Sequence, residues 1–313
     1  MPFDFEAAVV APFRMQPGLR RVAAGTAQLT PMAPGGRHQR EKLAVLSAFW
    51  QQALCAQEGF NAAPALHAVC TQAAAEHPQA WAWDGERAQA LQLGMAAHAD
   101  GRTEQTSAGS FGLGDEVARC LHGLPPRWRL AGLLCLSFVE DFAVLDGATG
   151  TLPWLAVTLP SHWAPEDKVG RHFAQAHGPV ADNALLLKAA DSLIRLVTGV
   201  ERWERFVWTL TDHPRLHAHP ARVAHERWQN TPVEQAFWRS EYQSFIPLPE
   251  RQQAVFTIHV DVQPLADALT TTERAAALRA AIASMTPAVL DYRGLSAVRE
   301  PLLAWLAERA AGA

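Results

Sequence analysis

The sequence predicts an α+β fold, in which an antiparallel sheet carries helices on one face. Apolar residues recur at helical spacing over much of the first half of the chain and again near its end. From residue 203 the period changes to two. The alternating segments 237–248 and 253–262 are joined by Pro249-Glu250-Arg251, which indicates a hairpin. Because the expected strands cluster instead of alternating with helices, a doubly wound parallel sheet is disfavoured.

The first half of the chain is expected to be mostly helical. Residues 1–40 hold several prolines and glycines with little periodicity, and we interpret them as an irregular arm that packs on a single domain formed by residues 41–313. The segment 100–113 is polar and rich in Gly and Ser, so a loop is expected there. Periodic or Ala-rich stretches predict helices at 41–59, 65–76, 86–99 and 114–122.

The second half mixes strands and helices. Residues 127–145 fit either a helix or a strand. The end of this segment, 142–146, indicates a hairpin with 152–159 around a turn rich in Asp and Gly. A further strand is expected at 203–210. Helices are expected at 166–176, where Gly178-Pro179 follows as a stop signal, and at 183–198, 271–284 and 299–310.

Composition excludes several classes of protein. The 313 residues are 49% hydrophobic, enough for a sizeable core, and the net charge of −4 offers no basic face for nucleic acid. No run of 18 apolar residues and no signal peptide are evident, so we expect a cytoplasmic protein that does not enter a membrane. The four scattered cysteines form no CxxC or CxxCH, which argues against a zinc ribbon, a redox pair or covalently attached haem.

The run from Pro160 to Val180 concentrates three histidines and several charged residues. In a helix, His177 would share one apolar face with Phe173 and Val169, whereas His172 would lie on the polar side. An inward imidazole on an apolar wall suits a haem iron. The alternative is a core histidine whose N–H groups are satisfied by carbonyls. His162 and His172 stay open as ligands, because the helix phase is uncertain by a residue or two.

A second cluster lies in the expected strand 237–248. There Arg239, Glu241, Gln243 and Phe245 share one face. Such a row of polar groups could order a carboxylate, an amine or a haem propionate, or it could be a solvated sheet face with cross-strand ion pairs.

Two further clusters are less specific. Glu140-Asp141 could perform acid–base work or hold an amine, or it could be a turn or capping pair. His213, His217, His219 and His225 could bind zinc or copper, but their spacing matches no familiar zinc signature. Pro214 and Pro220 favour an exposed loop there.

These segments, in this order, resemble the family of haem-dependent oxidative N-demethylase α-subunit-like proteins. The resemblance covers roughly residues 12–295, and the run 160–180 is its most specific part. The chain departs from the family pattern around the expected pocket, at Ala176, Ala181, Val207 and Tyr242. The matching residues are Pro12-Phe13-Arg14 with Gly18-Leu19, Glu140-Asp141, the run 160–180, Arg205 with Trp208, Arg239 with Glu241 and Gln243, Leu248-Pro249 and Phe256-Thr257-Ile258.

The resemblance implies a PAS-like haem-binding core with additional helices. It implies that non-covalent haem b, with His177 as iron ligand, uses O2 to oxidise an N-methyl group of a small amine, giving formaldehyde and the demethylated amine. Arg171 and Lys168 lie close to His177 in the sequence and are expected to pair with the haem propionates. Glu241, with Glu140 or Asp141, is expected to hold the cationic amine or relay protons.

Electrons would come from external flavin and iron–sulfur reductase subunits. This agrees with the lack of a GxGxxG that follows a strand, and neither a P-loop nor a GxSxG occurs in the sequence. Two alternatives stay open. One is a PAS-like haem or small-ligand sensor without catalysis. The other is an accessory subunit that has lost haem.

Overall fold

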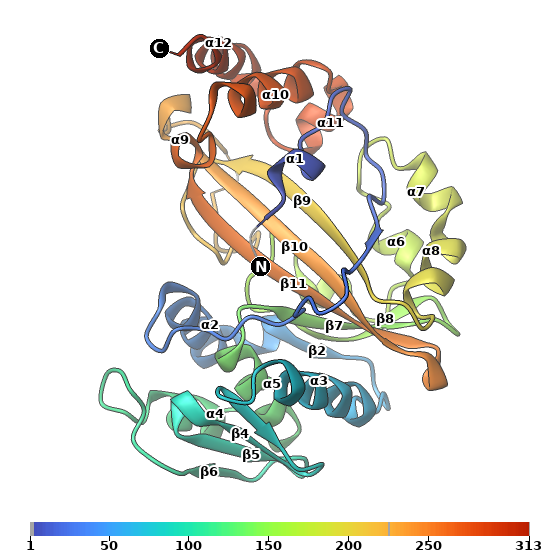
Figure 1. Cartoon of the computed structure of the whole chain (residues 1–313), viewed down its shortest axis with the longest axis vertical. Helices are drawn as coiled ribbons and strands as arrows, with labels where there is room; N and C mark the ends of the chain where they lie inside the picture. Colours follow the sequence, from blue (N-terminus) through green and yellow to red (C-terminus); the bar gives the residue numbers. More distant parts are fainter. Residues whose placement is uncertain (1–2, 225, 313) are drawn as a thin grey trace.

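A seven-stranded antiparallel sheet organises the molecule (Figure 1). The computed structural model describes residues 3–224 and 226–312. Together with the surrounding helices, this sheet confirms the α+β prediction. In spatial order its strands are β1 (Arg20–Arg21), β9 (Trp203–Thr211), β10 (Phe237–Leu248), β11 (Gln253–Pro264), β7 (Asp141–Asp146), β8 (Thr151–Ala156) and β2 (Leu54–Ala56).

The centre of this sheet is the hairpin expected from the sequence. β10 and β11 pair along twelve residues each, from Phe237 opposite Pro264 to Leu248 opposite Gln253. The connecting turn is a short 3-10 helix, η4 (Pro249–Arg251), and Gln252 follows it in the left-handed conformation with φ 52°. The hairpin of β7 and β8 and the strand β9 also lie where the sequence predicts them.

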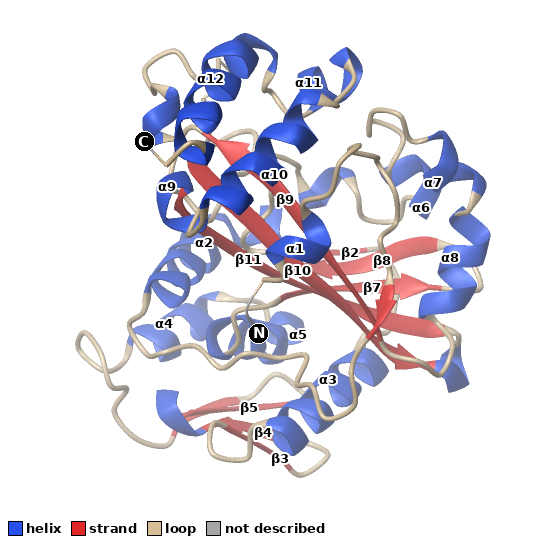
Figure 2. Ribbon diagram, turned by 45° about the horizontal axis from the view of Figure 1, so that its top comes forward, coloured by secondary structure: helices blue, strands red, loops and turns tan. Residues whose placement is uncertain are grey.

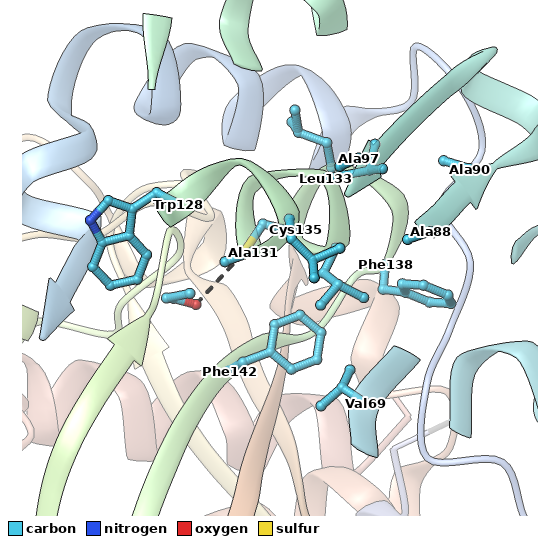
Figure 3. Packing of buried hydrophobic residues seen from close by; sticks show 14 of the residues in the cluster. Val69, Ala88, Ala90, Ala97, Trp128, Ala131, Leu133, Cys135, Phe138 and Phe142 are labelled. Atoms are coloured by element: carbon cyan, nitrogen blue, oxygen red, sulfur yellow. Dashed lines mark hydrogen bonds between the residues drawn. The ribbon is translucent and has the colours of Figure 1, made fainter. Parts of the chain in front are cut away.

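One face of the large sheet is covered by helices from the first half of the chain, α2 (Arg37–Ala53), α3 (Ala63–Glu76) and α5 (Pro126–Ser137), and α4 (Glu116–Gly123) packs on α2 and α5. Figure 3 shows α5 lying between Phe142 of β7 and the alanines of a smaller sheet. Trp128 of α5 stacks on Trp154 of β8 with ring centroids 5.5 Å apart. The ambiguous segment 127–145 is therefore a helix followed by a strand.

The smaller sheet corrects one sequence prediction. Its strands are β3 (Trp81–Trp83), β4 (Arg87–Ala90), β5 (Met95–His98) and β6 (Thr103–Gln105). Residues 86–99 were expected to be a helix and 100–113 a loop, so the helix prediction is wrong and the loop prediction is wrong at β6. The alanines favour a helix intrinsically, but Ala88, Ala90, Ala96 and Ala97 are buried in strands, and packing outweighs propensity.

The opposite face of the large sheet is also covered, so the expectation of helices on one face is wrong. Here the helices are short: α6 (Phe173–Ala176), α7 (Ala184–Lys188) and α8 (Ala190–Val197). Ile194 and Val197 of α8 pack with Leu145 and Phe245, whose side chains leave the sheet on this side. The expected helix 166–176 is only η2 (Pro165–Asp167) and the single turn α6, because Gly170 between them takes φ 74°.

The C-terminal helices form a third layer at one end of the sheet (Figure 2). They are α9 (Leu265–Ala268), α10 (Thr272–Ala283), α11 (Pro287–Tyr292) and α12 (Arg299–Ala310). α10 and α12 confirm the sequence prediction, whereas α11 was not expected. The N-terminal arm contributes α1 (Phe5–Ala8) to the same core, against Trp208 and Trp238. In the described part of the chain, no helix is long and apolar enough to cross a membrane.

Candidate functional site

A cavity of about 500 Å³ lies on the face of the large sheet that carries α6 and α8. Its size falls within the range of about 300–1,000 Å³ that is usual for ligand and cofactor pockets. The floor consists of β7, β9, β10 and β11, one wall is the segment 161–186, and the arm residues 7–20 form another. The apolar part of the lining includes Leu145, Leu152, Leu155, Phe173, Val180, Leu186, Phe245, Phe256 and Ile258.

His177, which directly follows α6, lines this cavity. Its Nδ1 lies 2.8 Å from the carbonyl oxygen of Phe173, which assigns the ring N–H to Nδ1 and leaves the lone pair on Nε2. Burial lowers the pKa of His177 to about 4, so the ring is neutral near pH 7. Histidines that ligate metals commonly fix their other ring nitrogen on a carbonyl in this way.

The reason for the inward position of His177 differs from the one expected. Val169 precedes Gly170 and is not part of α6, so the three residues do not share one helix face. The ring of Phe173 does pack against that of His177, with ring centroids 4.2 Å apart and a tilt of 38° between the ring planes. His172 instead caps α6, its Nδ1 accepting a hydrogen bond from the Ala174 N–H at 3.2 Å, and it does not line the cavity.

His162 is the second histidine that lines the cavity. It is a non-glycine residue with φ 62°, a conformation that costs energy and often marks a functional position. Its Nε2 is buried without a hydrogen-bond partner among the described residues. Burial, followed by the nearby charges of Arg227 and Arg239, lowers the pKa of His162 to about 3.

Polar side chains of β10 reach the cavity from the sheet. Glu241, Gln243 and Phe245 all line it, which confirms that they share one face. The amide nitrogen of Gln243 donates to a Glu241 carboxylate oxygen at 2.5 Å, and this bond orients the carboxylate. Arg239 lies on the same face but does not reach the cavity, because its guanidinium binds Ser161 and four backbone carbonyls.

Arg205 of β9 is a cavity residue that sequence reasoning did not select as a site residue. In the antiparallel register it lies opposite Gln243, while Val207 lies opposite Glu241. Its Nε is buried and has no hydrogen-bond partner among the described residues. The shared period of two in β9 and β10 is a signal that could have found Arg205. Phe13, which also lines the cavity, is marked only by the family resemblance, and no local pattern marks Arg293.

The two cations expected beside a cofactor are placed differently from each other. Lys168 lines the cavity, and its ammonium group donates to the carbonyl oxygen of Ala176 at 2.5 Å. Arg171 is exposed and donates instead to the carbonyl oxygen of Asp167, away from the cavity lining. Of this pair, the geometry therefore favours Lys168 for a propionate contact.

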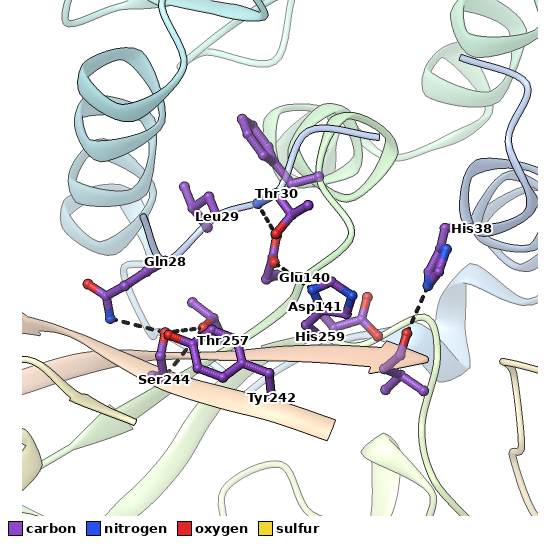
Figure 4. Close-up of polar contacts among 12 residues, drawn as sticks. Gln28, Leu29, Thr30, His38, Glu140, Asp141, Tyr242, Ser244, Thr257 and His259 are labelled. Carbon is purple, nitrogen blue, oxygen red and sulfur yellow. Dashed lines mark hydrogen bonds and ion pairs between the residues drawn. The ribbon is translucent and has the colours of Figure 1, made fainter. Parts of the chain in front are cut away.

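Glu140 and Asp141 do not join Glu241 at the cavity. Asp141 accepts hydrogen bonds from the Lys42 ammonium, the Thr158 hydroxyl and the Leu159 N–H, at 2.9, 2.6 and 2.6 Å. Glu140 accepts one from the Thr30 N–H, and its carboxylate lies 3.2 Å from Nδ1 of His259 (Figure 4). Both carboxylates are fully buried, and their bonds tie the arm and α2 to the sheet. The expectation that one of them acts beside Glu241 is not supported by this placement.

The histidine-rich segment 212–226 is a loop, as expected, but most of it is not exposed. Leu216 and Ala218 are buried, and Glu41 accepts hydrogen bonds from the backbone N–H groups of Leu216 and His217. Sequence reasoning missed this anchoring because Glu41 is distant in the chain. No group of three or more His, Cys, Asp or Glu side chains in residues 3–224 and 226–312 is arranged to hold a metal ion. His225 lies outside the described residues.

The cavity residues fit a haem group. The apolar floor suits a porphyrin, and the free Nε2 of His177 suits an iron ligand. Lys168 supplies positive charge that suits a propionate, and the buried Nε of Arg205 lacks a partner that an anionic group would supply.

The family model described as "Haem-dependent oxidative N-demethylase, alpha subunit-like" matches residues 126–303, which is more than half of the chain. The matched region holds β7 to β11 and the whole segment 161–186, and so most of the cavity described above.

Proposed function

Because the chain belongs to the haem-dependent oxidative N-demethylase, alpha subunit-like family, we propose that it is the catalytic subunit of an amine monooxygenase. The family description implies dependence on haem and a substrate that carries an N-methyl group. We infer further that the cofactor is non-covalent haem b in a PAS-like core formed within residues 41–313. The observation that carries this proposal is the neutral His177 ring, with Nε2 unbonded to any described residue, beside an apolar floor.

The proposed overall reaction is a balanced oxygen insertion. One atom of O2 enters a methyl C–H bond of the amine to give a carbinolamine. The other oxygen atom leaves as water, with two electrons and two protons supplied from outside. The carbinolamine then loses formaldehyde and leaves the demethylated amine. Bound haem supplies the activation of O2, and we propose that external flavin and iron–sulfur subunits supply the electrons.

The residues of this chain bind and orient the reactants. His177 would hold the cofactor through Nε2, with Lys168 as the candidate for a propionate contact. Glu241 would hold the ammonium form of the amine, and the Gln243 hydrogen bond fixes the direction of its carboxylate. The arm residues 7–20 close the cavity on one side and would limit the entry of water.

The first test is the visible absorption spectrum of the protein produced with a haem precursor. We expect a stoichiometric Soret band in the wild type that is lost in His177→Ala and restored by added imidazole. His162→Gln tests the second cavity histidine. His172→Asn is the matched control, because Asn can also cap α6 and His172 lies outside the cavity lining. A colourless wild type of native fold contradicts the proposal.

The second test concerns Glu241. With the haem protein reduced chemically in the presence of O2 and an N-methyl amine, we expect amine-dependent formaldehyde. Glu241→Gln keeps the shape of the side chain and its bond to Gln243 but removes the charge. We expect it to weaken amine binding by about 10- to 100-fold, as for the loss of a charged hydrogen bond. Unchanged binding and turnover would show that Glu241 does not hold the amine.

A further inference from the structure

The cavity contains more positive than negative charge. Among its described lining residues Glu241 is the one carboxylate, whereas Arg14, Lys168, Arg205 and Arg293 are cations without a carboxylate within 4.0 Å. Two other lining cations are neutralised: Arg20 pairs with Glu204 and Asp4, and Arg227 pairs with Asp212. A plain ammonium ion would add charge of the sign that the cavity already has in excess.

Haem would remove only part of this excess. It carries two propionates, so it can pair with two of the four free cations. Glu241 can balance a third or an incoming ammonium group, but not both. Arg14 is exposed to solvent, and Lys168 and Arg293 already donate to the carbonyl oxygens of Ala176 and Trp208. Arg205 is therefore the lining cation that has no hydrogen-bond partner among the described residues, and a buried charge is stable only when it is paired or hydrogen-bonded. The substrate is the remaining source of an anionic group.

Arg205 is best placed to receive that group. It lies opposite Gln243 on the strand next to β10, which makes it the diagonal neighbour of Glu241 on the same sheet face. The backbone positions of diagonal neighbours are about 7–8 Å apart, a distance that long side chains can bridge, so one small molecule can contact both charged groups. No Arg205–Glu241 bond forms, and the buried Nε of Arg205 has no described partner.

We propose that the substrate is a zwitterion, an N-methylated amino acid, whose ammonium group is held by Glu241 and whose carboxylate is held by Arg205. A simple methylated amine lacks the group that Arg205 binds. This inference rests on the proposed function for its chemistry, but the two charge contacts belong to the polypeptide and can be measured without turnover.

The test compares two ligands that differ in one carboxylate. N-methylglycine and dimethylamine are titrated into the ferric protein, followed by the Soret shift and by calorimetry. We expect N-methylglycine to bind about 10- to 100-fold more tightly, the value of one charge-assisted hydrogen-bonded contact. Arg205→Gln should abolish this preference and leave the haem content unchanged. Arg21→Gln removes the same charge from an exposed position that is paired with Glu201, and it should change neither quantity.

Each other outcome is decisive. Equal affinities for the two ligands in the wild type overturn the inference while the haem function stands. Loss of haem in Arg205→Gln, with the preference retained in residual holoprotein, assigns Arg205 to a propionate and also overturns it. If the wild type binds no haem, the proposed function fails, and calorimetry on the same protein still shows whether N-methylglycine binds through Arg205.

Discussion

Arg239 is a fully buried guanidinium without a carboxylate partner in the described chain. Its donors reach the hydroxyl of Ser161 at 2.7 Å and the carbonyl oxygens of residues 159, 160, 215 and 216 at 2.8 to 3.3 Å. Burial lowers its pKa only to about 10, so it remains charged near pH 7. Arg239 thereby holds two loops against β10, including the loop that places His162 in the cavity.

Arg239→Lys keeps the charge but replaces the planar set of five N–H donors with a single ammonium group. Because several carbonyls lose their donor, we expect the free energy of unfolding to fall by about 2–3 kcal/mol, the scale of lost hydrogen bonds to a charged group. Denaturant unfolding measures this change. Arg251→Lys, on the exposed turn after β10, is the control and should stay within about 0.5 kcal/mol of wild type.

Glu140 makes stability depend on pH. Burial raises its pKa, but the hydrogen bond and charge of His259 and the Thr30 N–H outweigh burial and hold the pKa below its ordinary value of 4.5. A carboxyl whose pKa is lower in the folded state stabilises the fold above its unfolded pKa, and this contribution is lost as pH falls through the folded pKa.

We therefore expect Glu140→Gln to be less stable than wild type at pH 7, by about 1–3 kcal/mol, and to lose less stability on acidification from about pH 5 to pH 3. Urea unfolding at several pH values gives both quantities. Glu201→Gln, half-exposed and paired only at the surface, is the matched control. Parallel pH profiles for Glu140→Gln and wild type would contradict a folded-state pKa shift at this residue.

At the scale of elements, the turn between β7 and β8 positions the single helical turn that precedes His177. Gly150 has φ 67°, and its carbonyl oxygen accepts the Phe173 N–H at 2.7 Å. A Cβ on Gly150 would collide with Nε2 of His172, whose Nδ1 caps α6. Thus a glycine on a distant hairpin maintains the position of the proposed iron ligand.

Gly150→Ala should lower the free energy of unfolding by about 2–3 kcal/mol. Of this, about 1–2 arises from the left-handed backbone and about 1 from the displaced cap. It should also weaken haem retention, seen as a smaller Soret band per protein. Gly25→Ala is the control: φ is 77° and an added Cβ meets nothing within 4 Å, so it should show the backbone cost alone. Full haem retention in Gly150→Ala would separate the turn from the site.

The same element scale shows where sequence reasoning succeeds. The period of two along 237–248 and 253–262 predicted the central hairpin and the shared face of Glu241, Gln243 and Phe245. It failed at 86–99, where the alternation of Arg87 and Gln89 with the buried Ala88 and Ala90 spans only four residues and Ala is a strong helix former. The helix prediction for 166–176 also failed, because Gly170 breaks that helix. The contacts of Arg239 and Asp141 were beyond prediction, because their partners come from segments far apart in the sequence.

At the scale of the whole molecule, one hydrophobic core joins the region matched by the family model to the region before it. This core includes Val45 and Leu46 of α2, Val69 of α3, and Ala88 of the small sheet. It continues into Val144, Trp154, Ile246 and Val255 of the large sheet. We propose on this basis that residues 41–313 fold as one unit, although the family match begins only at residue 126.

This unity predicts that a fragment of residues 126–313 does not fold alone. This fragment lacks α2 and α3, so the sheet face that carries Val144, Ile246 and Val255 would be exposed. The buried Asp141 would also lose the Lys42 ammonium, which lies 2.9 Å away in the intact chain. Loss of one partner from a buried ion pair alone costs about 3–5 kcal/mol, comparable to the net stability of a domain. We expect the fragment to aggregate, whereas the full chain unfolds in one cooperative calorimetric transition. A soluble fragment with its own cooperative transition would show instead that the matched region is an independent domain, and that the preceding helices and small sheet pack on it without being required for its fold.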